Sequence, residues 1–186
     1  MVCPTLGFPR PGIEFRHVLN IAQQRKGLET CIEMLNSHTG DWEFSKIACC
    51  ETGGFVFASS LALRIDEPLA LIRELGKLPP PTVSISKLSA HISSSDYDHS
   101  TESWIVIEQS LIPTDASVLV MDDVLASGRT LYDIIRVLRK VGIGLENMCV
   151  VVVAKFPSHR GRQFFREQGL GGVRIRRLLD LMVRRE

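Results

Sequence analysis

Apolar residues along the chain follow two alternating patterns, one with the spacing of a helix and one of short continuous runs. Helical spacing predicts helices over residues 15–36, 55–65, 130–141 and 161–168. Short apolar runs, which are typical of buried strands, cover residues 46–50, 69–73, 104–108, 117–121, 149–154 and 173–179. Strands separated by helices predict right-handed crossovers. We therefore expect an α/β fold with a central, mainly parallel sheet and helices on both faces.

The alternation runs through most of the chain, and 186 residues are an ordinary size for one domain. We therefore expect a single domain over residues 1–186. Residues 74–103 interrupt the pattern with three consecutive prolines and many serines. Because compact domains rarely contain irregular loops of this length, we expect this stretch to be a functional, mobile loop.

The composition excludes several classes of protein. Hydrophobic residues make up 45% of the chain and charged residues 23%, which excludes a disordered chain. No apolar run approaches the ~20 residues of a membrane-spanning helix, and the proline-containing N-terminus shows no apolar signal segment. The five cysteines form no Cys-x-x-Cys pair, and Cys49 and Cys50 would point to opposite faces of a strand. We expect reduced thiols, a cytoplasmic location and no membrane association.

The net charge of +1 hides an uneven distribution of charge. Residues 88–128 contain seven acids and no lysine or arginine, whereas residues 155–186 contain nine basic residues and three acids. A basic segment can bind nucleic acid, but Arg174 and Arg176 alternate along one face of a predicted strand and no aromatic residues alternate with them. We therefore expect a solvated or subunit-facing surface here and no nucleic-acid partner.

Residues 117–138, SVLVMDDVLASGRTLYDIIRVL, carry the pattern with the clearest chemical meaning. A buried strand ends in two carboxylates, Asp122 and Asp123, and a short turn of small residues then opens a helix. Backbone N–H groups, the positive end of the helix dipole and the hydroxyls of Ser127 and Thr130 can hold a phosphate there. The two acids lie where sugar hydroxyls or a hydrated magnesium ion could meet them. The alternative is an ordinary strand–helix turn in which Ser127 and Thr130 only cap the helix.

At these residues the sequence resembles a known family. VLVMDDVLASGRT resembles the phosphoribosyl pyrophosphate signature of type I phosphoribosyltransferases. Further segments are similar to those of the adenine-specific members, in the same order along the chain: FPRPGIEFR (8–16), ETGGFVFASSLA (51–62), LIRELGKLPPPT (71–82), HRGRQFF and GVRIRRLLDL. The resemblance covers about residues 8 to 180.

The resemblance implies a fold and an activity. The fold would be that of a type I phosphoribosyltransferase, with a small hood over the carboxyl end of the sheet. The activity would be transfer of phosphoribosyl from phosphoribosyl pyrophosphate to a purine base, adenine giving AMP, with release of pyrophosphate. It would require Mg²⁺ and serve purine salvage, and the family is usually homodimeric.

The resemblance also implies roles for the residues that match the family motifs. Asp122 and Asp123 would be the catalytic pair, meeting the ribose hydroxyls and ordering a magnesium hydration shell without a direct protein ligand to the metal. The substrate's 5′-phosphate would be held by the loop residues Ala126, Ser127, Gly128, Arg129 and Thr130.

The base and the pyrophosphate would be bound by residues from other segments. By the same resemblance, Phe15 would stack on the base while the main chain around Glu14 and Arg16 reads its edge. Arg73 and Lys77 would face the pyrophosphate.

The chain departs from the family pattern at three places. Gly53 stands where the family has an arginine, Glu74 where it has a lysine, and Ala90 where it has a glutamate that would handle the base proton. These departures leave two alternatives to the adenine enzyme. The first is a catalytically impaired sensor or regulatory protein that binds a nucleotide or phosphoribosyl pyrophosphate. The second is an enzyme with altered base specificity, because Glu14 would lie at the purine edge.

Overall fold

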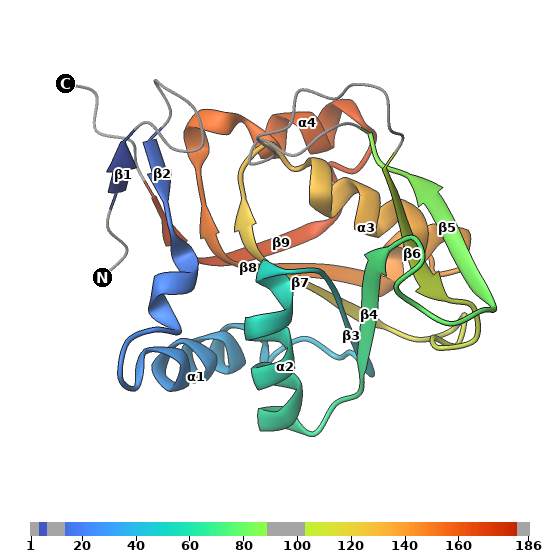
Figure 1. Ribbon diagram of the computed structural model, residues 1–186, viewed down its shortest axis with the longest axis horizontal. Helices are drawn as coiled ribbons and strands as arrows, with labels where there is room; N and C mark the ends of the chain where they lie inside the picture. Colours follow the sequence, from blue (N-terminus) through green and yellow to red (C-terminus); the bar gives the residue numbers. More distant parts are fainter. Residues whose placement is uncertain (1–3, 7–13, 89–102, 182–186) are drawn as a thin grey trace.

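A seven-stranded sheet, with strand order β5-β6-β4-β3-β7-β8-β9, forms the centre of the computed structural model, which describes residues 4–6, 14–88 and 103–181 (Figure 1). Strands β4, β3, β7, β8 and β9 pair in parallel, and β6 pairs antiparallel with both β4 and β5. The mainly parallel sheet expected from the sequence is confirmed. The strands are β3 (Lys46–Cys50), β4 (Leu69–Glu74), β5 (Thr82–Ser86), β6 (Trp104–Glu108), β7 (Val118–Leu125), β8 (Met148–Lys155) and β9 (Arg174–Asp180).

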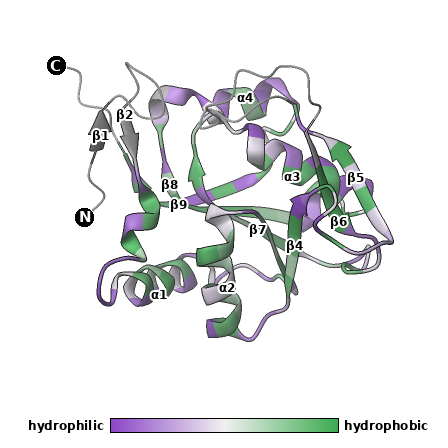
Figure 2. Ribbon diagram, in the orientation of Figure 1, coloured by the Kyte–Doolittle hydropathy of each residue, from purple (hydrophilic) through white to green (hydrophobic). Residues whose placement is uncertain are grey.

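Helices cover both faces of this sheet. On one face lie α1 (Gly27–Thr39) and α2 (Gly53–Ile65), and on the other lie α3 (Arg129–Lys140) and α4 (Gly161–Glu167) (Figure 1). Each face has its own cluster of buried apolar residues, and the hydropathy colouring shows the central strands as largely hydrophobic and the outer strand β9 as largely hydrophilic (Figure 2). None of the helices in the described ranges is both long and apolar enough to cross a membrane.

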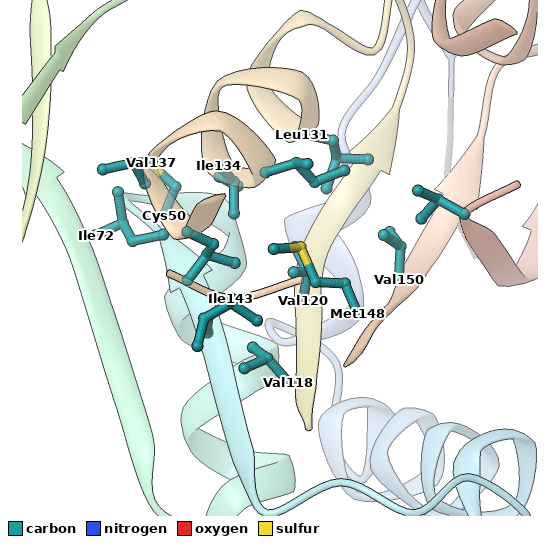
Figure 3. Packing of buried hydrophobic residues seen from close by; sticks show 14 of the residues in the cluster. Cys50, Ile72, Val118, Val120, Leu131, Ile134, Val137, Ile143, Met148 and Val150 are labelled. Atoms are coloured by element: carbon teal, nitrogen blue, oxygen red, sulfur yellow. The ribbon is translucent and has the colours of Figure 1, made fainter. Parts of the chain in front are cut away.

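The two clusters meet at the sheet, so the central strands are buried on both sides. Strand β8 is buried along Met148–Ala154, as its continuous apolar run predicts. Cys49 and Cys50 belong to opposite clusters, which confirms that they point to opposite faces of the strand, and both thiols are buried and free. On the α3 face, one stripe of the helix packs on β7 and β8 through Leu131, Ile134, Val137, Val118, Val120, Met148 and Val150 (Figure 3).

The first part of the chain differs from the helix predicted over residues 15–36. It forms a two-stranded antiparallel sheet of β1 (Pro4–Leu6) and β2 (Glu14–Arg16), a 3-10 helix (Val18–Ile21), and only then α1. Lys26 has a left-handed backbone (φ 61°), and a side chain on Gly27 would run into the carbonyl oxygen of Ile21. The apolar spacing is real, but the chain turns at Lys26 before it becomes an α-helix.

Two other boundaries also differ from the sequence expectation. Residues 74–103 were expected to be an irregular loop, but β5 forms within them, and residues 89–102 lie outside the described part of the chain. Polar residues of α3 hold this edge strand: Arg136 donates to the Ser86 carbonyl (3.0 Å) and Lys140 to the Ser84 carbonyl (2.9 Å). Strand β7 was expected to end at Met121 but continues to Leu125.

The packing of α3 on the sheet predicts a clear difference between a buried and an exposed apolar residue. Ile134 is fully buried on α3, whereas Leu63 on α2 is 87% exposed. We expect Ile134→Ala to lower the free energy of unfolding by about 2–5 kcal/mol, because it leaves a cavity. Leu63→Ala should change it by less than about 0.5 kcal/mol. Urea denaturation of both variants tests this; equal losses would contradict the packing described here.

Candidate active site at the carboxyl edge of the sheet

The carboxyl ends of the parallel strands bring together segments that are far apart in the sequence. The turn after β3 (residues 51–54), the end of β4 with the following turn (residues 73–77) and the end of β7 with its loop (residues 122–130) all lie at this edge. Open α/β sheets bind their ligands outside this edge. The structure therefore brings the sequence-predicted residues of these three segments to one side of the molecule.

The loop between β7 and α3 has the shape of an anion cradle. Gly128, directly before α3, adopts a positive φ of 81°, and its carbonyl accepts the N–H of Tyr132 (2.9 Å). A left-handed residue at a helix start turns successive N–H groups toward one point, and the first turn of the helix leaves its N–H groups without intrahelical partners. Ser127 and Thr130 are partly buried in the loop, and Arg129 is exposed. The cradle therefore has both backbone donors and hydroxyls.

Helix α4 packs against the loop between β7 and α3. A Cβ atom on Gly161 would run into the carbonyl oxygen of Ala126 and would come within 2.8 Å of Leu125. A Cβ atom on Gly128 would come within 3.0 Å of the Phe165 ring. Gly161 thus allows the first turn of α4 to touch the loop between β7 and α3. Sequence reasoning missed this supporting role, although the short Arg160-Gly161 step before a helix was its visible signal.

Asp122 and Asp123 form a pair of poorly solvated carboxylates near the end of β7. Asp122 is only 6% exposed, and its carboxylate accepts the N–H of Asp123 (3.0 Å). Burial, together with the charge of Asp123, raises the pKa of Asp122 well above its usual value. Burial also raises the pKa of Asp123, an effect partly offset by hydrogen bonds and by the nearby His17. Hydroxyl donors or a cation placed next to such carboxylates would stabilise their charged form strongly, because water screens these interactions only weakly there.

Gly53 and Gly54 make room for these two acids at the start of α2. A Cβ atom on Gly53 would come within 2.5 Å of the Asp123 carboxyl carbon, and one on Gly54 within 3.3 Å of Asp122 Oδ1. The Asp123 carboxylate thus packs directly against the first residue of α2, where the helix dipole favours a negative charge. An arginine in place of Gly53 would have to displace Asp123, so the departure at Gly53 is linked to the position of this acid.

Arg73 and Lys77, which were expected to face the pyrophosphate, lie at this edge and are both paired with acids of this chain. The Glu51 carboxylate accepts hydrogen bonds from Arg73 (3.2 Å) and the N–H of Glu74 (2.6 Å), and forms an ion pair with Lys77 (3.3 Å). Burial alone would raise the pKa of Glu51, but these partners outweigh it and lower the pKa. Glu51 is therefore an ionised centre that two cations share.

Glu74 extends this arrangement outward. Its carboxylate pairs with Lys77 (2.9 Å) and with Lys87 (3.2 Å), which follows β5. Hydrogen bonds from the two lysines lower the pKa of Glu74. We call Glu51, Arg73, Glu74, Lys77 and Lys87 the edge cluster. Sequence reasoning singled out Glu74 but did not identify Glu51 as the partner of Arg73 and Lys77, because that contact joins two separate strands.

The residues predicted to contact the base are described only in part. Phe15 and Arg16 belong to β2 by their backbone, and their side chains are outside the described part of the structure. Ala90 also lies outside the described residues. His17 follows β2 directly and lies close enough to Asp123 to lower the pKa of its carboxyl group. The 3-10 helix that follows His17 contacts β7. The small β1–β2 sheet is therefore attached beside the end of β7, where a hood was expected.

The donor set fits a magnesium ion that is held mainly by its substrate. The described residues contain no group of three or more histidine, cysteine or acidic side chains that could hold a metal ion. Two neighbouring carboxylates, Asp122 and Asp123, are oxygen donors of the type Mg²⁺ prefers, and Mg²⁺ commonly keeps several waters and binds through substrate phosphates.

The sequence matches the phosphoribosyl transferase domain family over residues 17–163. It is 31% identical over 172 residues to the adenine phosphoribosyltransferase of Kosmotoga olearia, and the match covers 92% of each chain. The adenine phosphoribosyltransferase of Vibrio campbellii is 29% identical over 164 residues, covering 88% of this chain and 83% of its own.

Solved structures show the same fold. The APRTase from Giardia lamblia complexed with 9-deazaadenine has a TM-score of 0.82 at 22% identity, covering 97% of this chain and 94% of its own. The adenine phosphoribosyltransferase from Thermoanaerobacter pseudethanolicus has a TM-score of 0.79 at 25% identity, covering 97% and 96%. The type I phosphoribosyltransferase fold expected from the sequence is thereby confirmed.

The raised pKa of Asp122 predicts a stability gain on removing its charge. The folded-state pKa lies above the unfolded value of about 3.9, so the folded chain holds this proton more tightly, and stability is lost as the pH rises through the folded pKa. Asp122→Asn keeps an acceptor for the Asp123 N–H. We expect its melting temperature without ligand to exceed that of the wild type by a few degrees at pH 7.5 and to match it near pH 4.

Thermal unfolding across this pH range tests the prediction, with the exposed Asp115→Asn as the control for loss of one acidic charge. A lower melting temperature for Asp122→Asn at pH 7.5 would mean that the Asp122 carboxylate stabilises the fold.

Proposed function

The chain belongs to the phosphoribosyltransferase family, and on this premise we propose that it transfers phosphoribosyl from phosphoribosyl pyrophosphate to adenine, giving AMP and pyrophosphate. One observation carries the proposal: the Asp122–Asp123 pair leads directly into the Gly128 cradle at the carboxyl edge. The relatives named for this activity match the chain over nearly its whole length.

In this proposal the loop and the acids hold the two ends of the ribose. The N–H groups and hydroxyls of residues 126–130 bind the 5′-phosphate at the start of α3. The carboxylates of Asp122 and Asp123 accept hydrogen bonds from the ribose hydroxyls. Because these carboxylates are poorly solvated, such bonds hold the sugar firmly while the bond to pyrophosphate breaks. Catalysis is then mainly positioning and stabilisation of charge.

Magnesium and the base complete the proposed site. Mg²⁺, when bound, neutralises charge on the diphosphate; Asp122 and Asp123 would orient its hydration shell. Phe15 and Arg16 lie on β2, and the next residue, His17, is close enough to Asp123 to lower its pKa. This proximity supports a base site between the β1–β2 sheet and the two acids. Phe15 would stack on the base and the main chain at Arg16 would read its edge.

The edge cluster also favours a second candidate function. Because Arg73 and Lys77 are already paired with Glu51 and Glu74, a diphosphate has to compete with these acids. A protein that binds a nucleotide or phosphoribosyl pyrophosphate as a sensor, with little turnover, would tolerate this. Altered base specificity is the remaining alternative, and Glu14 on β2 is the residue that would carry it.

We further propose a cytoplasmic, homodimeric enzyme of purine salvage that forms one domain over residues 1–186. Cys31, Cys49, Cys50 and Cys149 are buried free thiols, which supports a reducing compartment. A cavity of about 280 Å³ lies between α1 and β9 and is lined by Met34, Leu178 and Leu179 among others. We propose that a second copy of the chain packs over it. Sedimentation of the purified protein tests the dimer.

Steady-state assays test the proposed activity directly. Purified protein with Mg²⁺ and phosphoribosyl pyrophosphate is given adenine, guanine or hypoxanthine, and the release of pyrophosphate is followed. We expect turnover with adenine within the usual enzyme range of about 1–10³ per second. Binding of AMP without turnover of any base would favour the sensor. Turnover of another base alone would favour altered specificity.

The support of the cradle by α4 predicts the effect of one small substitution. Gly161→Ala places a methyl group against the Ala126 carbonyl and displaces the loop, at a cost of about 1–3 kcal/mol. We expect affinity for AMP, measured by calorimetry, to fall about tenfold or more. Gly172→Ala is the control, because an added Cβ there meets no atom within 4 Å. Wild-type AMP affinity in Gly161→Ala would exclude residues 126–130 as the phosphate site.

A further inference from the structure

The two acids of the edge cluster differ in how firmly they are held. The Glu51 side chain is 12% exposed and is bound by Arg73, Lys77 and a backbone N–H, so it braces the turn after β4. The Glu74 side chain is 48% exposed and is held only through the ammonium groups of Lys77 and Lys87 among the contacts of the described residues. The Glu51 side chain is therefore held in place, whereas the Glu74 carboxylate can turn away from the two lysines into solvent.

The carboxylate of Glu74 lies between two cations, as an oxygen of a bound anion would. Its oxygens are 2.9 Å from Lys77 Nζ and 3.2 Å from Lys87 Nζ. The two lysines differ in burial, because the Lys87 side chain is only 10% exposed whereas that of Lys77 is 43% exposed. A phosphate oxygen that binds these two lysines must first displace Glu74.

We propose that Glu74 is a specificity-determining residue that occupies, with its own carboxylate, the place of a diphosphate oxygen between Lys77 and Lys87. It thereby lowers the affinity for ligands that carry a diphosphate relative to ligands that carry only a 5′-phosphate. The inference rests on the proposed function, in which the diphosphate of the donor is bound at the end of β4.

The architecture of the sheet separates this effect from the 5′-phosphate site. Glu74 ends β4, and the cradle follows β7; β3 lies between them. Neighbouring strands are about 4.8 Å apart, so the two strands are ~10 Å apart. A ligand with only a 5′-phosphate reaches the cradle without disturbing the pairs of Glu74. The donor needs both places, and so meets the competing carboxylate.

The geometry also fits a reversible competitor better than a fixed block. The Glu74 N–H is bound to Glu51, which holds the backbone, while the side chain is half exposed. When a diphosphate arrives, only the carboxylate has to turn outward into water. Glu51 then keeps Arg73 and Lys77 in place, so the cations stay available at the edge.

Glu74→Gln tests the inference, because it removes the charge and keeps the size. Calorimetry at fixed Mg²⁺ and ionic strength measures affinity for pyrophosphate, phosphoribosyl pyrophosphate and AMP. We expect pyrophosphate and phosphoribosyl pyrophosphate to bind about 2- to 30-fold more tightly to the variant, as expected for loss of two partly exposed ion pairs. Affinity for AMP should change less than about twofold, and the KM for the donor should fall while that for adenine stays constant.

Glu43→Gln is the matched control. Glu43 is exposed and precedes β3, so it lies at the opposite edge of the sheet, and its replacement changes the net charge by the same amount. We expect no change in affinity for any of the three ligands. Melting temperatures of both variants check that the fold is intact.

The outcomes separate this inference from the proposed function. The inference is overturned if Glu43→Gln binds pyrophosphate as tightly as Glu74→Gln does, or if Glu74→Gln gains as much affinity for AMP as for pyrophosphate. It is also overturned if Glu74→Gln leaves the affinity for diphosphate ligands unchanged, or if neither the wild type nor Glu74→Gln binds pyrophosphate. Absence of AMP binding in the wild type, with tighter pyrophosphate binding in Glu74→Gln, would overturn the proposed function and leave the role of Glu74 intact.

Discussion

Burial of β3, β7 and β8 between two helical layers is the constraint on which the rest of the molecule depends. These strands have apolar side chains on both faces, so they are stable only in a parallel sheet covered on both sides. Parallel pairing in turn places all their carboxyl ends at one edge. Three polar segments that lie far apart in the sequence thereby become neighbours. The site follows from the way in which the apolar residues are buried.

Much of this architecture was predictable from the sequence, because burial leaves a periodic pattern. The continuous apolar run of β8 and the apolar stripe of α3 were both predictable, and the Asp122–Thr130 loop was recognisable from its spacing. The turn at Lys26 was not predictable, because its cause is a close backbone approach between Gly27 and Ile21. Strand β5 was missed for a related reason: this short edge strand is held by Arg136 and Lys140 from a helix about fifty residues away.

Within the candidate site, the sequence identified residue types but not their pairing. A charge reversal at Glu74 was visible, yet its consequence depends on Lys87, which joins the edge from another strand. Likewise, the missing arginine at Gly53 looked like a simple loss, whereas the structure shows the Asp123 carboxylate packed against this glycine. Electrostatic roles of this kind depend on distances across strands, which no local pattern contains.

Helix α3 connects the two halves of the site. It begins at Arg129, directly after Gly128 of the β7–α3 loop, and one turn later its buried Asp133 accepts the N–H of Leu88 (3.1 Å) and pairs with Arg136 (3.0 Å). Leu88 adjoins Lys87, so the helix that starts the cradle also fixes the chain that carries a partner of Glu74. An α-helix is stiff over three turns, and its apolar face is packed on the sheet. The cradle and the edge cluster therefore keep a constant separation, as the proposed donor, with phosphates at both ends of one ribose, requires.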